Sequence, residues 1–389
     1  ICMMCRNQSK KTKKLINSDL IKFIDLKIIN ELKEHKFNDL EQLKSFEVND
    51  LPVGRMVYST LTTKLNDSFF SAKENKETLN GLINNAIGLY KSIQKLILNE
   101  KIELLYAWNG RRSCDGPAVY AAKNLKINYS TFISGGKYNS ILVRKGSETV
   151  HDVEEAVIEM NQLSKDYDNP KKKYEITKGA INYFEFASGG KKDENVNYLG
   201  YYTYSQLFKD SKNTFKKNNK KILAIFTGTY SEYAGVPGFD SSNNYCKDFY
   251  EGIDFIQKNS HKLKDYEIIV RWHPNSRYLI GNEKEKLEKL ILNSKKYDNV
   301  KHISPDSDFN TYNLIKNCDV AIGFGTSVTI EACLYGKPSI FIGNNLFQGL
   351  KCFYRPNSYD ELFELLDSEL TPKSFKDALI WGYYFQSFG

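Results

Sequence analysis

The residues best suited to bind a phosphate or a sugar follow a short apolar run near the C-terminus. The run from Val320 to Phe324 has the composition of a strand buried on both faces, and Gly325, Thr326 and Ser327 come directly after it. Glycine lets a ligand approach the backbone closely, and the two hydroxyls stand where a helix N-terminus is expected. Such a turn at the carboxyl end of a strand is a common anion site in α/β proteins, although an ordinary turn without a ligand has the same composition.

The helix after this turn carries a carboxylate among apolar residues. Glu331 lies four residues after Ser327, on the same helical face. A buried carboxylate needs a polar partner, and a ribose or sugar hydroxyl would be suitable. The helix should run to about Tyr335 and stop at Gly336, and a strand is expected at 338–342. Strand, turn, helix and strand form a βαβ unit.

Two other strand ends in the same half carry polar residues. Thr227 and Gly228 end the strand expected at 221–227, and Glu232 follows in a hydroxyl-rich loop. The carboxyl ends of parallel strands meet at one edge of a sheet, so these residues are candidates for the same site.

The next expected strand, at 267–272, ends in the sequence Arg-Trp-His-Pro-Asn. Arg271 and His273 lie on one face of that strand because side chains alternate with a period of two, and Pro274 fixes the turn. A cation and an imidazole at this place suit a pyrophosphate or a phosphodiester. A packed histidine before a proline turn is the simpler alternative.

The N-terminal half has its own polar group after the strand expected at 103–108. The group contains Asn109, Arg111, Arg112 and Asp115. Arginine can hold a phosphate or carboxylate with two hydrogen bonds, and a carboxylate can serve as general base or nucleophile toward a hydroxyl. A charged surface turn is the alternative interpretation. Farther along the chain, His151 either belongs to a helix start with Asp152 or faces a cleft.

The length of the chain is compatible with a two-domain protein, and no recognised nucleic-acid motif accompanies its positive charge. The chain has 389 residues and a net charge of +8, with lysines in runs such as 171–173. These runs are either solvated loops or a surface for anionic lipid headgroups or a phosphorylated acceptor. Scattered cysteines, with no long apolar stretch and no signal sequence, favour a cytoplasmic location, with a peripheral position on the inner face of the cytoplasmic membrane as the alternative. Cys2 and Cys5 are a lone C-x-x-C pair, and the start at Ile1 suggests a missing upstream segment.

The order of motifs resembles a known family of enzymes. The motifs are LYAWNGR, SETVHD, IFTGTYSEY, RWHPN, GFGTSVTIEACLYGKPSI and a terminal WGYY. This order resembles that of bacterial capsule and lipopolysaccharide glycosyltransferases of the GT-B architecture, over nearly the whole chain. The His273–Pro274 pair and the later Ser/Thr helix start look like those of capsule Kdo transferases, bacterial polysialyltransferases and teichoic-acid polymerases, which use cytidine-nucleotide donors.

The resemblance implies an α/β, GT-B-like fold with two Rossmann-like domains facing a cleft. We expect an acceptor domain at 1–215, a nucleotide-sugar donor domain at 216–372, and a C-terminal helix at 373–389 that packs back on the first domain. The stretch 166–220 is the expected linker.

The resemblance also implies roles for the candidate residues. His273 and Arg271 would hold the donor phosphate, Thr326 and Ser327 would bind phosphate at the helix start, and Glu331 would hold the ribose or sugar. The related enzymes place an acidic catalytic residue in the N-terminal half. The expected catalytic residues are Asp115, Arg111, Asn109 and, as the rival acid, Glu232.

The expected activity is transfer of a sugar from a nucleotide-activated donor to a surface-polysaccharide or lipid-linked glycan acceptor. A cytidine nucleotide such as CMP-Kdo or CMP-nonulosonate is the favoured donor. Arg271, His273 and a helix N-terminus would stabilise the charge on the donor phosphate without a metal ion, so we expect no metal and no cofactor besides the nucleotide sugar. The alternatives are a CDP-glycerol-type polymer transferase, an inactive nucleotide-sugar-binding protein and a UDP-sugar epimerase.

Overall fold

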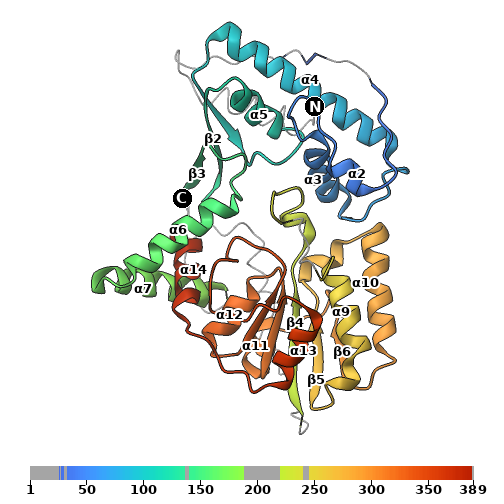
Figure 1. Cartoon of the computed structure of the whole chain (residues 1–389), viewed down its shortest axis with the longest axis vertical. Coiled ribbons are helices and arrows are strands. Elements are labelled where there is room, and N and C mark those ends of the chain that lie inside the picture. The colour runs from blue at the N-terminus through green and yellow to red at the C-terminus, as the bar shows by residue number, and fades with distance from the viewer. Residues whose placement is uncertain are drawn as a thin grey trace.

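The computed structural model describes residues 26, 28–29, 33–135, 140–187, 220–239 and 245–387. It shows two α/β domains, with the N-terminal domain above the C-terminal one in Figure 1. The expected α/β class and the GT-B-like pairing of two domains are confirmed. The Cys2 and Cys5 pair and residues 188–219 of the expected linker lie outside the described residues. The described residues 170–187 of that stretch form a helix and not a linker. Within the described part of the chain, no helix is both long and apolar enough to cross a membrane.

The C-terminal domain is built on a parallel five-stranded sheet in the order β6-β5-β4-β7-β8. Its strands are β4 (Lys221–Thr227), β5 (Tyr266–Arg271), β6 (Val300–Ile303), β7 (Val320–Phe324) and β8 (Ser339–Ile342). Helices α9 (Phe249–Lys258), α10 (Gly281–Ser294) and α13 (Tyr359–Asp367) cover one face, and α11 (Thr311–Asn317) and α12 (Val328–Leu334) cover the other. The strand order reverses between β4 and β7, and the carboxyl ends at such a switch point are where α/β sheets bind ligands.

The N-terminal domain has a small mixed sheet. Its elements are α2 (Leu40–Lys44), α3 (Val53–Leu65), α4 (Lys76–Glu100), β1 (Leu104–Trp108), α5 (Gly116–Asn124), β2 (Asn128–Ser134) and β3 (Ile141–Lys145). β1 pairs with β2 in parallel, as the expected strand–helix–strand unit requires, whereas β3 pairs with β2 antiparallel. The long α4 forms because apolar residues recur at helical spacing, and it buries Leu79, Ile83 and Ala86.

Three helices form a separate cluster at the side of the molecule: α6 (Val153–Asp166), α7 (Pro170–Ala187) and α14 (Lys376–Ser387) (Figure 1). α14 lies close against α7 because Gly382 faces Ala180 and Phe184 without an intervening side chain. The three helices share one apolar core with α12, β8 and the chain at 346–353. α6 and α7 therefore share a core with the C-terminal domain, whereas the expected boundary at 215 grouped them with the N-terminal one. The domain boundaries stay a prediction.

The two domains meet at the start of α10 through a reciprocal pair of carboxylates. Asp67 of the N-terminal domain accepts hydrogen bonds from the backbone N–H groups of Asn282 at 2.9 Å and Glu283 at 3.2 Å. In return, the Ser68 N–H donates to Oε2 of Glu283 at 2.7 Å. This is the arrangement of a capping box, with its two halves on different domains. Asp67 and Glu283 are both buried.

Candidate functional site

Three strands of the C-terminal sheet end in glycines that touch one another. Gly228, after β4, donates its N–H to the carbonyl of Phe324 at 3.1 Å. A Cβ added to Gly228 would lie 3.2 Å from the carbonyl oxygen of Gly325, which itself has a φ of +61°. Gly343, after β8, packs against Gly325 in the same way. The switch point therefore presents bare backbone, as expected for Gly228 and Gly325.

The hydroxyls after β7 are engaged locally. Ser327 occupies the N-cap position of α12 without a side-chain capping bond, and its Oγ donates to Oε1 of Glu331 at 3.1 Å. Oγ1 of Thr326 accepts from the N–H of Val328 at 3.4 Å. α12 has only seven residues, so the helix start alone does not define an anion site.

Glu331 has partners within the protein. The hydroxyl of Tyr312 donates to its Oε2 at 2.6 Å, and Ser327 bonds the other oxygen. Burial raises the pKa of the Glu331 carboxyl, against the opposing effect of these two hydrogen bonds. The expectation that a sugar hydroxyl is needed to satisfy this carboxylate is therefore corrected: Tyr312, which sequence reasoning missed, already does so.

Arg271 also has internal partners. Its guanidinium donates to the carbonyls of Ser304 at 2.6 Å and of Ser307 and Phe309 at 3.3 Å each. Burial lowers the pKa of Arg271 to about 10. The side chain thus fixes the loop between β6 and α11, so the geometry gives it a structural role, and we leave it out of the phosphate site proposed below.

His273 is held in one orientation and one tautomer. Its backbone N–H donates to Oγ1 of Thr227 at 3.0 Å, and its Nδ1 accepts from the N–H of Asn275 at 3.1 Å. An Nδ1 that accepts carries no proton, so the neutral ring has its proton on Nε2. Burial lowers the pKa of His273, while the nearby Glu232 raises it. The ring, followed by Pro274 at the start of a short helical turn, therefore offers a neutral N–H donor.

Arg111 crosses from the N-terminal rim to the C-terminal domain. Its Nη1 donates to the carbonyl of Ala234 at 3.1 Å and its Nη2 to that of Ser231 at 3.3 Å. Burial and the neighbouring Arg112 lower its pKa to about 10, whereas Asp115 and Glu232 act in the opposite direction. The loop after β4 is the one that rises toward the upper domain in Figure 1.

Asp115 lies at the start of α5, beside Arg111 and Arg112. Its Oδ1 accepts from the N–H of Arg112 at 2.8 Å, and burial raises the pKa of its carboxyl to about 6, although both arginines lower it. At neutral pH the group is mostly ionised yet basic enough to accept a proton. Glu232 is exposed on the opposite domain, and its charge acts on both Arg111 and His273. The structure therefore brings the N-terminal rim, Glu232 and His273 to one domain boundary.

Seven buried polar atoms in the chain that follows the strands have no partner among the described residues. They are Oδ1 of Asn109, Nε of Arg111 and Arg112, Nδ1 of His151, Oγ1 of Thr229, Oδ1 of Asn275 and Oε1 of Gln348. All seven are buried, and such atoms cost free energy unless something bonds them. The ring of His151 meets that of Tyr233 edge-on at 5.8 Å. Burial, together with the charges of Arg111, Arg112 and Arg144, lowers the pKa of His151 to about 3.

Sequence reasoning did not single out Tyr233, Asn345 or Gln348. Asn345 donates through its Nδ2 to the carbonyl of Gly325 at 2.8 Å, and so supports the glycine edge. Both Asn345 and Gln348 follow β8, so the rule applied to the other strands, that polar residues at carboxyl ends form a site, would have found them.

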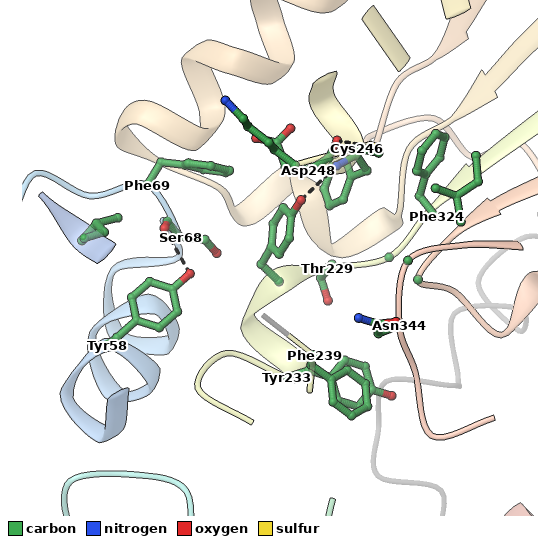
Figure 2. A pocket seen from close by; sticks show the side chains of 18 of the residues that line it. Tyr58, Ser68, Phe69, Thr229, Tyr233, Phe239, Cys246, Asp248, Phe324 and Asn344 are labelled. Atoms are coloured by element: carbon green, nitrogen blue, oxygen red, sulfur yellow. Dashed lines mark hydrogen bonds between the residues drawn. The ribbon is translucent and has the colours of Figure 1, made fainter. Parts of the chain in front are cut away.

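A cavity of about 580 Å³ lies beside this polar region, between the two domains (Figure 2). Gly228 and Gly325 line it, but His273, Ser327, Glu331 and Asp115 do not. The reason is the alternation along β5. Trp272 packs into the core on the α9 side of the sheet, so Arg271 and His273 face the α11 side. The cavity and the expected donor residues are therefore neighbours on opposite sides of the glycine edge.

Known proteins give similarities of fold. No family model matches the chain, and no curated protein does. Two solved structures of Thermosulfurimonas dismutans KpsC are similar to this chain. The β-Kdo 2,7 transferase is 13% identical over 75% of this chain and 79% of that chain, with a TM-score of 0.38. The β-Kdo 2,4 transferase is 14% identical over 72% of this chain and 79% of that chain, with a TM-score of 0.43. The UDP-GlcNAc 2-epimerase of Methanocaldococcus jannaschii, solved with UDP-GlcNAc and UDP, is similar at 13% identity over 77% of this chain and 79% of that chain, with a TM-score of 0.34.

In the described part of the chain, no three His, Cys, Asp or Glu side chains are grouped to hold a metal ion.

Proposed function

We propose that this chain is a glycosyltransferase that moves a sugar from a nucleotide-activated donor to a surface-polysaccharide or lipid-linked glycan acceptor. A cytidine nucleotide, such as CMP-Kdo or CMP-nonulosonate, is the favoured donor. The observation that carries the proposal is the state of His273. Its Nδ1 is occupied by the Asn275 N–H, so a neutral Nε2–H donor stands after β5 beside the switch point.

In this proposal, His273 donates a hydrogen bond to the donor phosphate. Charge develops on the phosphate oxygen as the bond to the anomeric carbon breaks, so a fixed donor stabilises the transition state more than the ground state. The hydroxyl of Thr227 accepts from the His273 N–H and so positions the histidine. Gly228 and Gly325 allow the donor to approach the backbone closely.

Asp115 is the proposed general base. It takes the proton of the acceptor hydroxyl as that oxygen bonds to the anomeric carbon, and the nucleotide leaves with the electron pair of the broken bond. Its pKa of about 6 suits this role at neutral pH. Arg111 holds the loop that carries Glu232 against the N-terminal domain, so it positions the site, and Asn109 places its unpaired Oδ1 on the same rim. Glu232 remains the alternative base.

The test is release of nucleotide and mass of the product, with CMP-Kdo as first donor and a panel of other nucleotide sugars. His273→Ala should lower kcat/KM about a hundredfold or more, as loss of one fixed donor does at comparable sites. His261→Ala is the matched control, because His261 is an exposed histidine of the same domain. Wild-type turnover by His273→Ala would refute the assignment.

A second candidate function, nucleotide-sugar binding without transfer, is favoured by the internal partners of two expected donor residues. Arg271 and Glu331, two residues expected at the donor, are bonded within the chain. A nucleotide-sugar-binding protein without transferase activity would tolerate this arrangement. Thermal stabilisation by CMP, CDP or UDP with neither transfer nor donor hydrolysis would support it. A product heavier by a glycerol phosphate unit would support the CDP-glycerol alternative.

We also propose a peripheral contact with anionic membranes. α7 carries Lys171, Lys172 and Lys173 in its first turn, next to Tyr174, whose side chain is 67% exposed. Lysines near an anionic surface and an exposed aromatic ring together suit lipid headgroups. Co-sedimentation with vesicles containing phosphatidylglycerol, reduced by replacing the three lysines with glutamine, is the measurement.

A further inference from the structure

The chain after β4 crosses from the C-terminal domain to the N-terminal one, and we call residues 229–239 the strap. Ala234, in the middle of the strap, is 2% exposed and belongs to the apolar core of the N-terminal domain. Figure 1 shows this segment rising from the C-terminal sheet toward α3. A segment that begins in one domain is therefore built into the core of the other.

Gly235 sets how closely the strap approaches α3. Its φ is +72°, which favours glycine, and a Cβ added to it would lie 2.7 Å from the carbonyl oxygen of Arg55 and 2.8 Å from Cβ of Ser59. Both atoms belong to α3, and the oxygen is part of the helix backbone. Because that oxygen cannot swing aside as a flexible side chain can, a larger residue at position 235 must push the strap away from the helix.

Arg111 adds polar contacts to this packing. The residue is 7% exposed, and its guanidinium donates to the carbonyls of Ala234 at 3.1 Å and Ser231 at 3.3 Å. If the strap were released in place, a buried cation would lose two acceptors that little water can replace. Apolar burial, close packing and charge-assisted hydrogen bonds thus all hold the strap to the N-terminal domain.

The strap begins at residues that belong to the proposed donor side. Oγ1 of Thr227 accepts from the N–H of His273 at 3.0 Å, and Gly228 donates its N–H to the carbonyl of Phe324 at 3.1 Å. Thr229 is the next residue of the chain. Since no spacer separates the strap from these two hydrogen bonds, a displacement of the strap acts directly on both.

Tyr233 gives the strap a second link to the glycine edge. Its ring stacks on Phe239 with 4.4 Å between centroids (Figure 2). Burial raises the pKa of Tyr233, and a hydrogen bond from the side chain of Asn345 opposes this effect. Asn345 also donates to the carbonyl of Gly325 at 2.8 Å, and its Oδ1 accepts from the N–H of Leu346 at 2.7 Å. The amide is bonded at both of its ends, so Asn345 has one orientation and connects Tyr233 to Gly325.

We propose that the N-terminal domain positions the donor side of the C-terminal domain through the strap, with Gly235 and Tyr233 as positioning residues. The inference rests on the proposed function, and it adds how one domain sets the geometry of the other. Neither residue has to touch the donor. Gly235 fixes the place of the strap, and Tyr233 fixes Gly325 through Asn345. His273 keeps its orientation only while the strap is docked.

The test is ¹⁵N NMR of the full chain labelled at histidine, at neutral pH, with His273→Ala to assign the signals. The wild-type ring should show an unprotonated Nδ1 and a protonated Nε2. Gly235→Ala should bring the two nitrogen shifts closer, because both tautomers become populated, and hydrogen exchange should speed up at 273–276. Gly238→Ala is the matched control: its φ is +82°, but a Cβ there meets no heavy atom within 4 Å.

A second pair of variants tests the link through Asn345. Tyr233→Phe keeps the stacked ring and removes the hydroxyl, so exchange should speed up at 343–346. Tyr266→Phe is its control, because it removes a buried hydroxyl that donates to the Leu366 carbonyl at 3.1 Å, from the first residue of β5 and so from the other end of the sheet. In transfer assays, Gly235→Ala should lower kcat/KM about 10- to 100-fold relative to Gly238→Ala, since a displacement of about 1 Å can cost a hundredfold.

The outcomes are distinct. Equal His273 shifts and equal exchange at 273–276 in the two glycine variants would overturn the inference, and so would equal exchange at 343–346 in the two tyrosine variants. The tyrosine pair decides alone if Gly235→Ala does not fold. Altered His273 shifts in a chain whose wild type transfers no sugar would refute the proposed function and leave the strap standing. Equal transfer by the two glycine variants, with equal shifts, would do the reverse.

Discussion

Asp67→Ala should weaken the contact between the two domains more than it weakens either domain. The substitution removes the acceptors of two backbone N–H groups at the start of α10. Loss of an N-cap costs about 1 kcal/mol, and a second buried N–H left without a partner adds about 1–3 kcal/mol. The expected loss is therefore about 2–4 kcal/mol, a large part of the stability of an ordinary domain.

Hydrogen exchange distinguishes this effect from the loss of an ordinary cap. In Asp67→Ala, protection should fall both at 281–284 and at 66–70, because Ser68 donates to Glu283 across the same contact. Ser358→Ala is the matched control: Ser358 caps α13 within one domain by accepting from the Glu361 N–H at 3.0 Å. That variant should lose protection only at the start of α13.

Two results would refute the reasoning. In one, Asp67→Ala loses less than about 0.5 kcal/mol in urea unfolding, which would mean that water replaces the carboxylate at no cost. In the other, exchange increases at 281–284 alone, and the pair then acts as a local cap and not as a link between domains.

Further predictions concern pH and metal. If Asp115 is the base, kcat/KM should rise with pH through about 6, and Asp115→Asn should remove that limb while Glu232→Gln keeps it; the opposite pattern would make Glu232 the base. Burial lowers the pKa of His151 to about 3, of His302 to about 4, and of His273 below 6.5. The unfolded chain therefore binds more protons below pH 6.5, so stability is full above 6.5 and falls as the pH drops, by up to ~1.4 kcal/mol per pH unit for each histidine. Urea unfolding at pH 7.5 and 5.5 checks this, and equal stability at both would contradict it. EDTA should leave transfer unchanged, and activity restored only by Mg²⁺ would show that a metal takes part.

The C-terminal sheet could be predicted well because its strands are buried on both faces. β4, β7 and β8 are nearly continuous apolar runs, and each ends in glycine, so composition and turn signals agree. After β8, Tyr354 makes a single bridge to Ile340. The antiparallel β3 was missed, because a five-residue run with two charges resembles a loop as much as a strand.

The partners of the site residues could not be predicted in the same way. Periodicity placed Arg271 and His273 on one face of β5, but it does not say whether a charged group meets a ligand or the chain itself. For Arg271 the partners are carbonyls more than thirty residues away. Likewise, the sequence does not say which core the apolar residues of α6 and α7 join, and only the structure shows it.

The side cluster of helices has a consequence for synthesis of the chain. The buried face of α7, with Tyr183 and Phe184, is covered by α14, which leaves the ribosome roughly 190 residues later. At about 5–20 residues per second, that interval is on the order of 10–40 s. During this time the aromatic face of α7 has no final neighbour, so the nascent chain must be shielded by chaperones or by temporary contacts. Arg144 and Tyr384, 2.6 Å apart in the folded protein, join the middle of the chain to its last helix only when translation is nearly complete.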